Sequence, residues 1–289
     1  MHRIVISLLG TACFLLAQTA QPKKSPYPHD MVWFNIPKNP PPGVVHKSYF
    51  SASMKTQVGY SIYLPPEYEK GTGRYPVIYW LHGRGGTEAS NGYPLRYLPP
   101  TPIIIVYANG GSQTNYCDSY DGKYMGETTI IKELIPYIDQ NYRTIATREG
   151  RSIQGMSMGG FGAMRLGLEF PGLFSSLVAF AGGYRFPDEM AGAPPSYQEM
   201  YNNDVEVFRE RHPETWARRN LKQIRGKMTI QMYVGKDDPG LKGNRRMHQV
   251  LTELEIPHGY EEFDGIAHNL TKLAEHVQSK NFLIALGKQ

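Results

Sequence analysis

The 289-residue sequence predicts an α/β fold, with a mostly parallel central sheet, helices on both faces and an antiparallel start. Apolar runs typical of strands alternate with segments of helical spacing along most of the chain. The runs at 75–83 and 102–109 are continuously apolar, as expected for strands that are buried on both faces of a parallel sheet. Segments 44–53 and 56–65 are strand-like, and the alternation of the second is typical of a half-buried antiparallel pair.

The remaining elements follow in chain order. Helical spacing of isoleucine and leucine predicts a helix over 126–142. A short strand over 151–154 and a helix over 158–170 are expected next. Pro171 ends that helix because proline cannot donate the next hydrogen bond. Further strands are expected at 175–182, 228–235 and 259–265, with helices at 241–255 and 269–286. The stretch 183–226 interrupts this alternation and is predicted to be a lid-like insertion, since long connections are often functional.

Residues 1–20 have the layout of a secretory signal peptide, with Arg3, an apolar run over 4–17 and small residues after it. The run is shorter than the roughly 18 residues that a membrane span needs. We therefore expect a secreted or periplasmic protein without a membrane span. A lipoprotein anchored at Cys13 is disfavoured, because Gly10 stands where an aliphatic residue is expected. Residues 21–43 contain seven prolines and predict an extended arm, the Pro-rich arm, before a main domain over 44–289.

Charge and cysteine content exclude some classes of function. The formal net charge is +5, and the densest basic stretch, 209–227, is interleaved with glutamates, as on a solvated helix face. A nucleic-acid partner is not expected, because that would require a denser basic stripe with stacking aromatics. Removal of the leader takes Cys13 away and leaves Cys117 alone, so we expect a buried free cysteine and no internal disulfide.

The motif Gly155-Met156-Ser157-Met158-Gly159 suggests a nucleophilic serine. In a G-x-S-x-G turn between a strand and a helix, small neighbours allow the strained serine backbone and expose the hydroxyl. Small residues at this place could instead serve only close helix packing. The predicted strand before Ser157 and helix after it favour the nucleophile.

A serine hydroxyl needs a base and a group that orients the base. After Ser157 the chain offers the acidic pair Asp237-Asp238 directly beyond one predicted strand, and His268 in the loop beyond the next. Both lie where loops leave the carboxyl edge of a parallel sheet, and the order serine, acid, histidine is that of α/β hydrolases. Local chemistry does not separate Asp237 from Asp238. The other histidines after Ser157 lie in helical segments or just before a strand, which makes them weaker candidates.

Acyl transfer also requires donors for the oxyanion that forms on the substrate. The backbone N–H of Met158, the residue after the serine, is the first expected donor. The second is expected in the glycine-rich turn LHGRGG, at the main-chain N–H of Arg84. His82 precedes the serine in the chain, so a structural role is expected for it. This chemistry requires neither a metal nor a cofactor.

Three motifs carry a resemblance to a known family: YPVIYWLHGRGGTE, ETTIIKELIPYIDQNYR and GRSIQGMSMGGFGAM. They resemble the esterase family of α/β hydrolases over roughly residues 50–287. That family includes esterase D (S-formylglutathione hydrolase), feruloyl and acetylxylan esterases and the mycolyltransferases of the antigen 85 group. The resemblance implies the α/β-hydrolase fold. It also favours Asp238 as the acid, since the family places it at the end of a G-x-x-D turn. Glu127 matches a glutamate at the start of a family helix, which implies a supporting or capping role. The family's G-G-H pattern is not kept at Ile266-Ala267-His268.

The resemblance implies a serine carboxylesterase, and together with the predicted leader it implies a secreted one, with feruloyl or acetyl groups on carbohydrate as the expected substrates. Secretion suits a polysaccharide substrate, and five tyrosines in predicted loops near the site could contact it or simply pack on the core: Tyr93, Tyr97, Tyr116, Tyr120 and Tyr124. One alternative is acyl transfer to a sugar acceptor, as mycolyltransferases do. Another is a thioesterase like S-formylglutathione hydrolase, which the leader disfavours. A binding protein without catalysis would require a broken triad, and every member is present.

Overall fold

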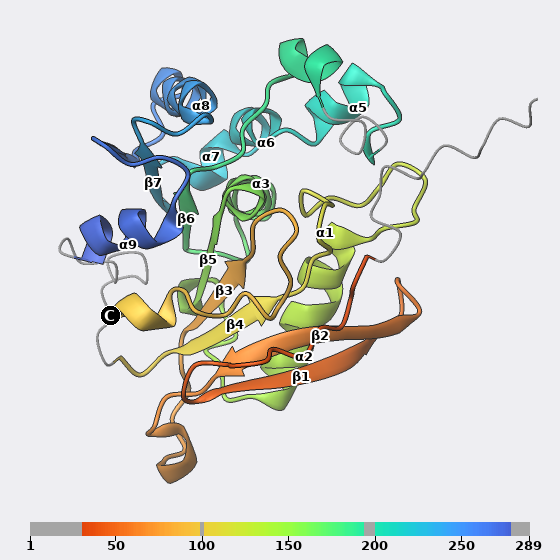
Figure 1. The fold of residues 1–289 in the computed structure, drawn as a ribbon, viewed down its shortest axis with the longest axis vertical. Coiled ribbons are helices and arrows are strands. Elements are labelled where there is room, and N and C mark those ends of the chain that lie inside the picture. Colours follow the sequence, from red (N-terminus) through yellow and green to blue (C-terminus); the bar gives the residue numbers. More distant parts are fainter. Residues whose placement is uncertain (1–30, 99–100, 194–199, 279–289) are drawn as a thin grey trace, which may run out of the picture.

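A computed structural model describes residues 31–98, 101–193 and 200–278 (Figure 1). The expected signal peptide, the first part of the Pro-rich arm and the end of the last predicted helix lie outside these ranges. In the part that is described, no helix combines the length and the apolar character needed to cross a bilayer.

The described residues form one eight-stranded sheet in the order β1-β2-β4-β3-β5-β6-β7-β8. β1 (Val44–Ser51) pairs antiparallel with β2 (Thr56–Tyr63), which pairs antiparallel with β4 (Ile104–Ala108). All the other pairs are parallel. Their strands are β3 (Val77–Leu81), β5 (Arg151–Met156), β6 (Ser176–Phe180), β7 (Thr229–Gly235) and β8 (Gly259–Phe263). Figure 1 shows β1 and β2 at one end of the sheet and β7 towards the other. The predicted mostly parallel sheet with an antiparallel start is confirmed.

The helices lie close to their predicted ranges. α1 (Gly126–Thr128), a π-helical segment (Thr129–Leu134) and α2 (Ile135–Asn141) form the stretch expected over 126–142. α3 (Met158–Glu169), α8 (Leu241–Glu253) and α9 (Leu270–Gln278) also follow the predictions within the described residues. Four short 3-10 helices were not predicted: Tyr68–Lys70, Leu95–Tyr97, Arg148–Gly150 and Pro187–Gly192.

The central strands are buried on both faces, which explains their continuous apolar runs. In β3 the side chains of Val77, Tyr79 and Leu81 join one hydrophobic cluster. The side chains of Ile78 and Trp80 alternate with them and join a second cluster on the other face of the sheet. The first cluster includes side chains of α2, α3 and α8, and the second includes side chains of α9. The helices thus cover both faces and leave the carboxyl edge of the strands for the site.

The described parts of the stretch 183–226 are largely helical and pack on the rest of the domain. It contains α5 (Val205–Glu210), α6 (Pro213–Arg219) and α7 (Leu221–Ile224). The side chains of Phe186, Tyr201 and Phe208 are fully buried in the first hydrophobic cluster, and α6 contacts α3. In this structure the insertion therefore extends the core of the domain.

Candidate active site

Ser157 lies in the sharp turn between β5 and α3. Its backbone has φ 58° and ψ −117°, a conformation that costs a non-glycine residue free energy and is often found at functional sites. Two backbone hydrogen bonds hold the turn, one from Ser157 N–H to Phe180 O at 2.9 Å and one from Gly183 N–H to Ser157 O at 2.9 Å. The strain is thus maintained by the loop that follows the neighbouring strand β6.

Two glycines of the motif allow the turn to pack. A Cβ added to Gly155 would lie 2.5 Å from the backbone of Gly159. A Cβ on Gly159 would lie 2.0 Å from the carbonyl oxygen of Leu81, the last residue of β3. Neither position has room for a side chain, because helix α3 approaches β3 and β5 this closely. This contact brings the glycine-rich loop that follows β3, here called the β3 loop (residues 82–86), next to Ser157.

His268 and Asp238 are joined by a hydrogen bond. The imidazole Nδ1 donates to Asp238 Oδ2 over 2.7 Å, and the Gly240 N–H donates to Asp238 Oδ1 over 2.6 Å. The Asp238 side chain is fully buried, whereas that of His268 is 39% exposed. Asp237 is exposed, and its N–H donates to Ile266 O at 3.0 Å. Asp238, and not its neighbour, therefore contacts the histidine.

The bond to Asp238 fixes the chemistry of the imidazole. It raises the pKa of His268 above 6.5, partly opposed by burial, which lowers it. Since Nδ1 carries the proton shared with the carboxylate, Nε2 of the neutral ring is left as a proton acceptor.

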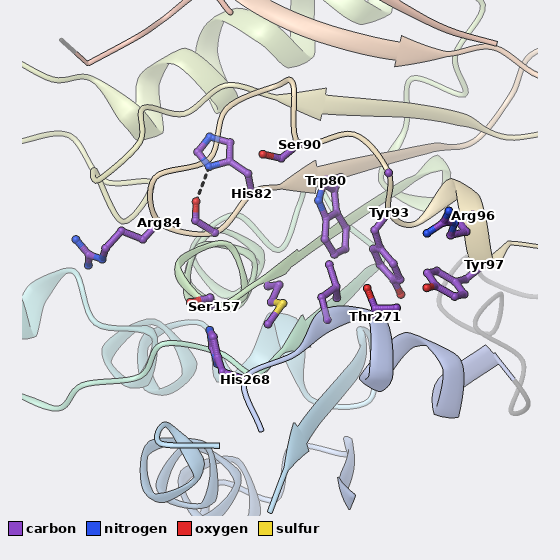
Figure 2. A pocket seen from close by; sticks show the side chains of 14 residues that line it. Trp80, His82, Arg84, Ser90, Tyr93, Arg96, Tyr97, Ser157, His268 and Thr271 are labelled. Atoms are coloured by element: carbon purple, nitrogen blue, oxygen red, sulfur yellow. Dashed lines mark hydrogen bonds between the residues drawn. The ribbon is translucent and has the colours of Figure 1, made fainter. Parts of the chain in front are cut away.

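Ser157 and His268 line the same cavity, of about 610 Å³. In Figure 2 the ring of His268 lies next to Ser157 with a nitrogen turned towards it. This arrangement can pass a proton from the serine hydroxyl through the histidine, with the carboxylate stabilising the imidazolium.

The two expected oxyanion donors belong to segments that adjoin Ser157. Met158 is the first residue of α3, and amides of a first helical turn have no partner within the helix. Arg84 lines the cavity, and a Cβ on the preceding Gly83 would lie 3.6 Å from Ser157 Cβ. The turn is shaped by His82, whose Nδ1–H donates to Gly83 O over 2.9 Å. Burial lowers the pKa of His82 to about 4, so this ring is neutral at physiological pH.

Glu127 is not among the residues that line the cavity. Its carboxylate pairs with the buried Arg165 of α3, whose Nη1 donates to Tyr116 O at 3.2 Å. The hydroxyl of Tyr116 donates in turn to His82 O at 3.0 Å. The start of the helix is capped by Asp118, whose Oδ1 accepts from the N–H groups of Glu127 and of the next residue, both over 3.0 Å. Three successive contacts, through Arg165 and Tyr116, thus link Glu127 to His82 at the start of the loop that carries Arg84.

Aromatic residues form the wall of the cavity away from Ser157. Trp80 and Tyr93 have ring centroids 4.4 Å apart, and those of Tyr93 and Tyr97 are 5.6 Å apart. Tyr93 and Tyr97 are two of the five loop tyrosines singled out in the sequence, while Tyr116 is fully buried beneath the β3 loop. Trp80 and Arg96 also line the cavity but were not among the predicted site residues, and Trp80 was expected only as part of a strand. The position of Trp80 near the carboxyl end of β3 was the available signal.

Comparisons with known proteins identify the family of this chain. Residues 51–272 match the family model described as "Putative esterase". An esterase of Mycobacterium tuberculosis is 37% identical over 132 residues, which cover 43% of this chain and 29% of the relative. An endo-1,4-beta-xylanase/feruloyl esterase of Xylanibacter ruminicola is 31% identical over 162 residues, covering 50% of this chain and 22% of the relative. The chain thus spans less than a third of the length of these curated relatives.

Solved structures share the fold. An S-formylglutathione hydrolase from Agrobacterium tumefaciens superposes with a TM-score of 0.71 at 20% identity, over 84% of this chain and 95% of that one. The family match covers the sheet from β2 to the loop after β8, together with Ser157, Asp238 and His268. The chain therefore belongs to the esterase family of α/β hydrolases.

Proposed function

We propose that the protein is a secreted serine carboxylesterase that hydrolyses feruloyl or acetyl esters of carbohydrates. The observation that carries this proposal is the hydrogen bond between Asp238 and His268 beside the strained Ser157 in one cavity. The composition of residues 1–20 supports secretion, and the relative from Xylanibacter ruminicola supports the feruloyl substrate by its name.

In the proposed reaction, Ser157 Oγ attacks the ester carbonyl carbon and His268 Nε2 takes the hydroxyl proton. The carbonyl oxygen becomes an oxyanion that accepts hydrogen bonds from the N–H groups of Met158 and Arg84. The C–O bond to the alcohol then breaks, and His268 returns the proton to the departing oxygen. Water attacks the acyl-enzyme by the same route and releases the carboxylic acid and free Ser157.

The aromatic wall gives this proposal a substrate preference. Trp80, Tyr93 and Tyr97 offer flat apolar faces, on which an aromatic acyl group such as feruloyl can stack. An acetyl group would leave this wall uncovered. We therefore expect feruloyl esters to be cleaved with the lower KM.

Transfer of the acyl group to a sugar is the second candidate. It is favoured by an adjoining cavity of about 650 Å³, here called the arm pocket, which offers room for an acceptor. The arm pocket is lined partly by the Pro-rich arm, at Asn39, Pro41 and Pro42, and it shares Gly92 and Arg96 with the catalytic cavity. Hydrolysis and transfer use the same acyl-enzyme and differ only in whether water or sugar attacks it.

Product analysis by mass spectrometry tests both candidates. The purified protein would be incubated with feruloylated and acetylated xylo-oligosaccharides and an excess of free sugar, beside Ser157→Ala and the remote control Ser175→Ala. Free ferulate or acetate that depends on Ser157 would support the esterase, and acylated free sugar would support the transferase. Equal turnover by wild type and Ser157→Ala would contradict both.

A further inference from the structure

Among the residues that the structure describes, cationic but no acidic side chains line the catalytic cavity and the arm pocket. Arg84 and Arg96 line the catalytic cavity, Arg96 also lines the arm pocket, and no aspartate or glutamate lines either one within the described residues. A third cavity, near α5 and α6, differs in this respect. There Arg209, Arg218 and Arg246 lie among carboxylates such as Glu214 and pair with acidic residues.

Arg96 differs from the other arginines in the described ranges. Each of the others has a side-chain hydrogen bond or an ion pair with another residue of the protein. In residues 31–98, 101–193 and 200–278, the guanidinium of Arg96 has neither, although its backbone N–H bonds to Gly92 O. An arginine without a protein partner beside a cavity retains its five donors for a ligand.

Arg96 and the reacting serine both line the cavity, on opposite sides of its aromatic residues. Arg96 belongs to the 3-10 helix Leu95–Tyr97, and Figure 2 shows it with Tyr97 on the right of the view, while Ser157 lies left of the centre. In this view Trp80 and Tyr93 lie between them. A ligand that extends from Ser157 along the aromatic wall therefore reaches Arg96 with the end remote from its ester bond.

We propose that Arg96 is a specificity residue that binds a carboxylate of the substrate, so that the enzyme prefers anionic esters. A guanidinium binds a carboxylate through two parallel hydrogen bonds, and no carboxylate of the described cavity lining competes for it. Because Arg96 is exposed, the attraction is screened by salt. This inference rests on the proposed esterase function and deepens it by naming the charge of the substrate.

The carboxylate could belong to the acyl group, as in a dicarboxylic half-ester, or to a uronic acid residue of an esterified carbohydrate. Two pairs of substrates distinguish these sources. The first pair is the 4-nitrophenyl half-ester of adipic acid and its neutral carboxamide. The second pair is an O-acetylated methyl galacturonoside and the corresponding galacturonamide. Within each pair the shape is nearly constant and only the charge changes.

The experiment measures kcat/KM for both pairs with the wild type, Arg96→Gln, Arg96→Lys and the remote control Arg218→Gln. The wild type should favour the carboxylate member of one pair by about tenfold, as a charge-assisted hydrogen bond at an exposed site implies. Arg96→Gln should abolish this preference and leave turnover of the carboxamide unchanged. Arg96→Lys should keep part of the preference, Arg218→Gln should keep all of it, and salt should weaken it. The pair that shows the preference identifies the source.

Other results would overturn the inference. Turnover of both carboxamides that depends on Ser157, without a preference for either carboxylate, would reject the role of Arg96 and leave the esterase proposal standing. An equal loss on charged and neutral substrates in Arg96→Gln would show a structural role instead. Absence of any turnover that depends on Ser157 would reject the esterase proposal, and the inference with it.

Discussion

Asp238 is fully buried and lies 2.7 Å from the imidazole of His268, whose side chain is 39% exposed. The carboxylate is therefore shielded from water, while the ring that it orients reaches the cavity. A buried acceptor keeps an imidazole in one tautomer more effectively than a solvated one, because water does not compete for the hydrogen bond. The preceding residue, Asp237, has the same side chain on the surface and provides a matched control.

Replacing Asp238 by asparagine should lower kcat by about 10⁴-fold, since the amide favours the wrong tautomer of the histidine. The substitution is nearly isosteric, so the fold should be retained. Stopped assays with an aryl ester, together with circular dichroism, measure the two effects. Asp237→Asn should behave as the wild type. Comparable losses in both variants would mean that Asp238 does not act through His268.

The pH dependence of kcat/KM should have a rising limb with a pKa above 6.5. His268 must be neutral to accept a proton, and its bond to Asp238 raises its pKa above that value. The same shift implies that this pair stabilises the fold below pH 6.5, and that the contribution is lost as pH rises through the pKa of the folded state. An initial-rate profile from pH 5 to 9 measures the limb, which Asp238→Asn should move to lower pH. An identical limb in the variant would contradict this assignment.

Replacing Arg165 by leucine should destabilise the protein by about 3–5 kcal/mol, because it leaves two carboxylates that are only 15% and 11% exposed without their partner. Arg165 pairs with both Glu127 and Glu169, and its own side chain is 2% exposed. Urea unfolding followed by tryptophan fluorescence measures the change. The control is Arg218→Ala, which removes an exposed pair and should cost less than about 1 kcal/mol. A loss below 1 kcal/mol for Arg165→Leu would show that the network contributes little to stability.

Replacing Gly159 by alanine should abolish activity and destabilise the fold by about 1–3 kcal/mol through overpacking. Its new Cβ would lie 2.0 Å from Leu81 O, so α3 or the β3 loop must shift. Thermal unfolding and an aryl-ester assay measure both effects. Gly172→Ala, where a Cβ would meet nothing within 4 Å, should change neither. A fully active Gly159→Ala variant would mean that the turn tolerates such a shift.

The sequence predicted the sheet well because its strands have a strong physical signature. Runs such as 75–83 are apolar throughout, since both faces of β3 are covered, and that pattern does not depend on distant residues. The order of the strands carries no such local signal. Insertion of β4 between β2 and β3 results from long-range pairing, which the chain order does not reveal.

The sequence predicted the site residues that directly follow the ends of strands. It did not predict those whose role depends on how the rest of the chain packs around them. Ser157, Asp238 and His268 each come directly after a strand or in the loop beyond it, so topology alone brings them to one edge. Arg96 carried no sequence signal, because its significance is that its guanidinium has no partner among the described residues. That absence depends on which carboxylates the fold places elsewhere.

The strand order also separates the reacting groups. Ser157 follows β5 and His268 follows β8, and strands β6 and β7 lie between them in the sheet. In contrast, the turn that carries Asp238 and the loop that carries His268 are joined directly by the hydrogen bond from Asp237 N–H to Ile266 O. The acid and the base therefore share one local unit, while the alignment of that unit with the nucleophile depends on the twist accumulated over the intervening strands. Substitutions that change the packing of β6 and β7 should therefore alter turnover, although none of them replaces a residue that lines the cavity.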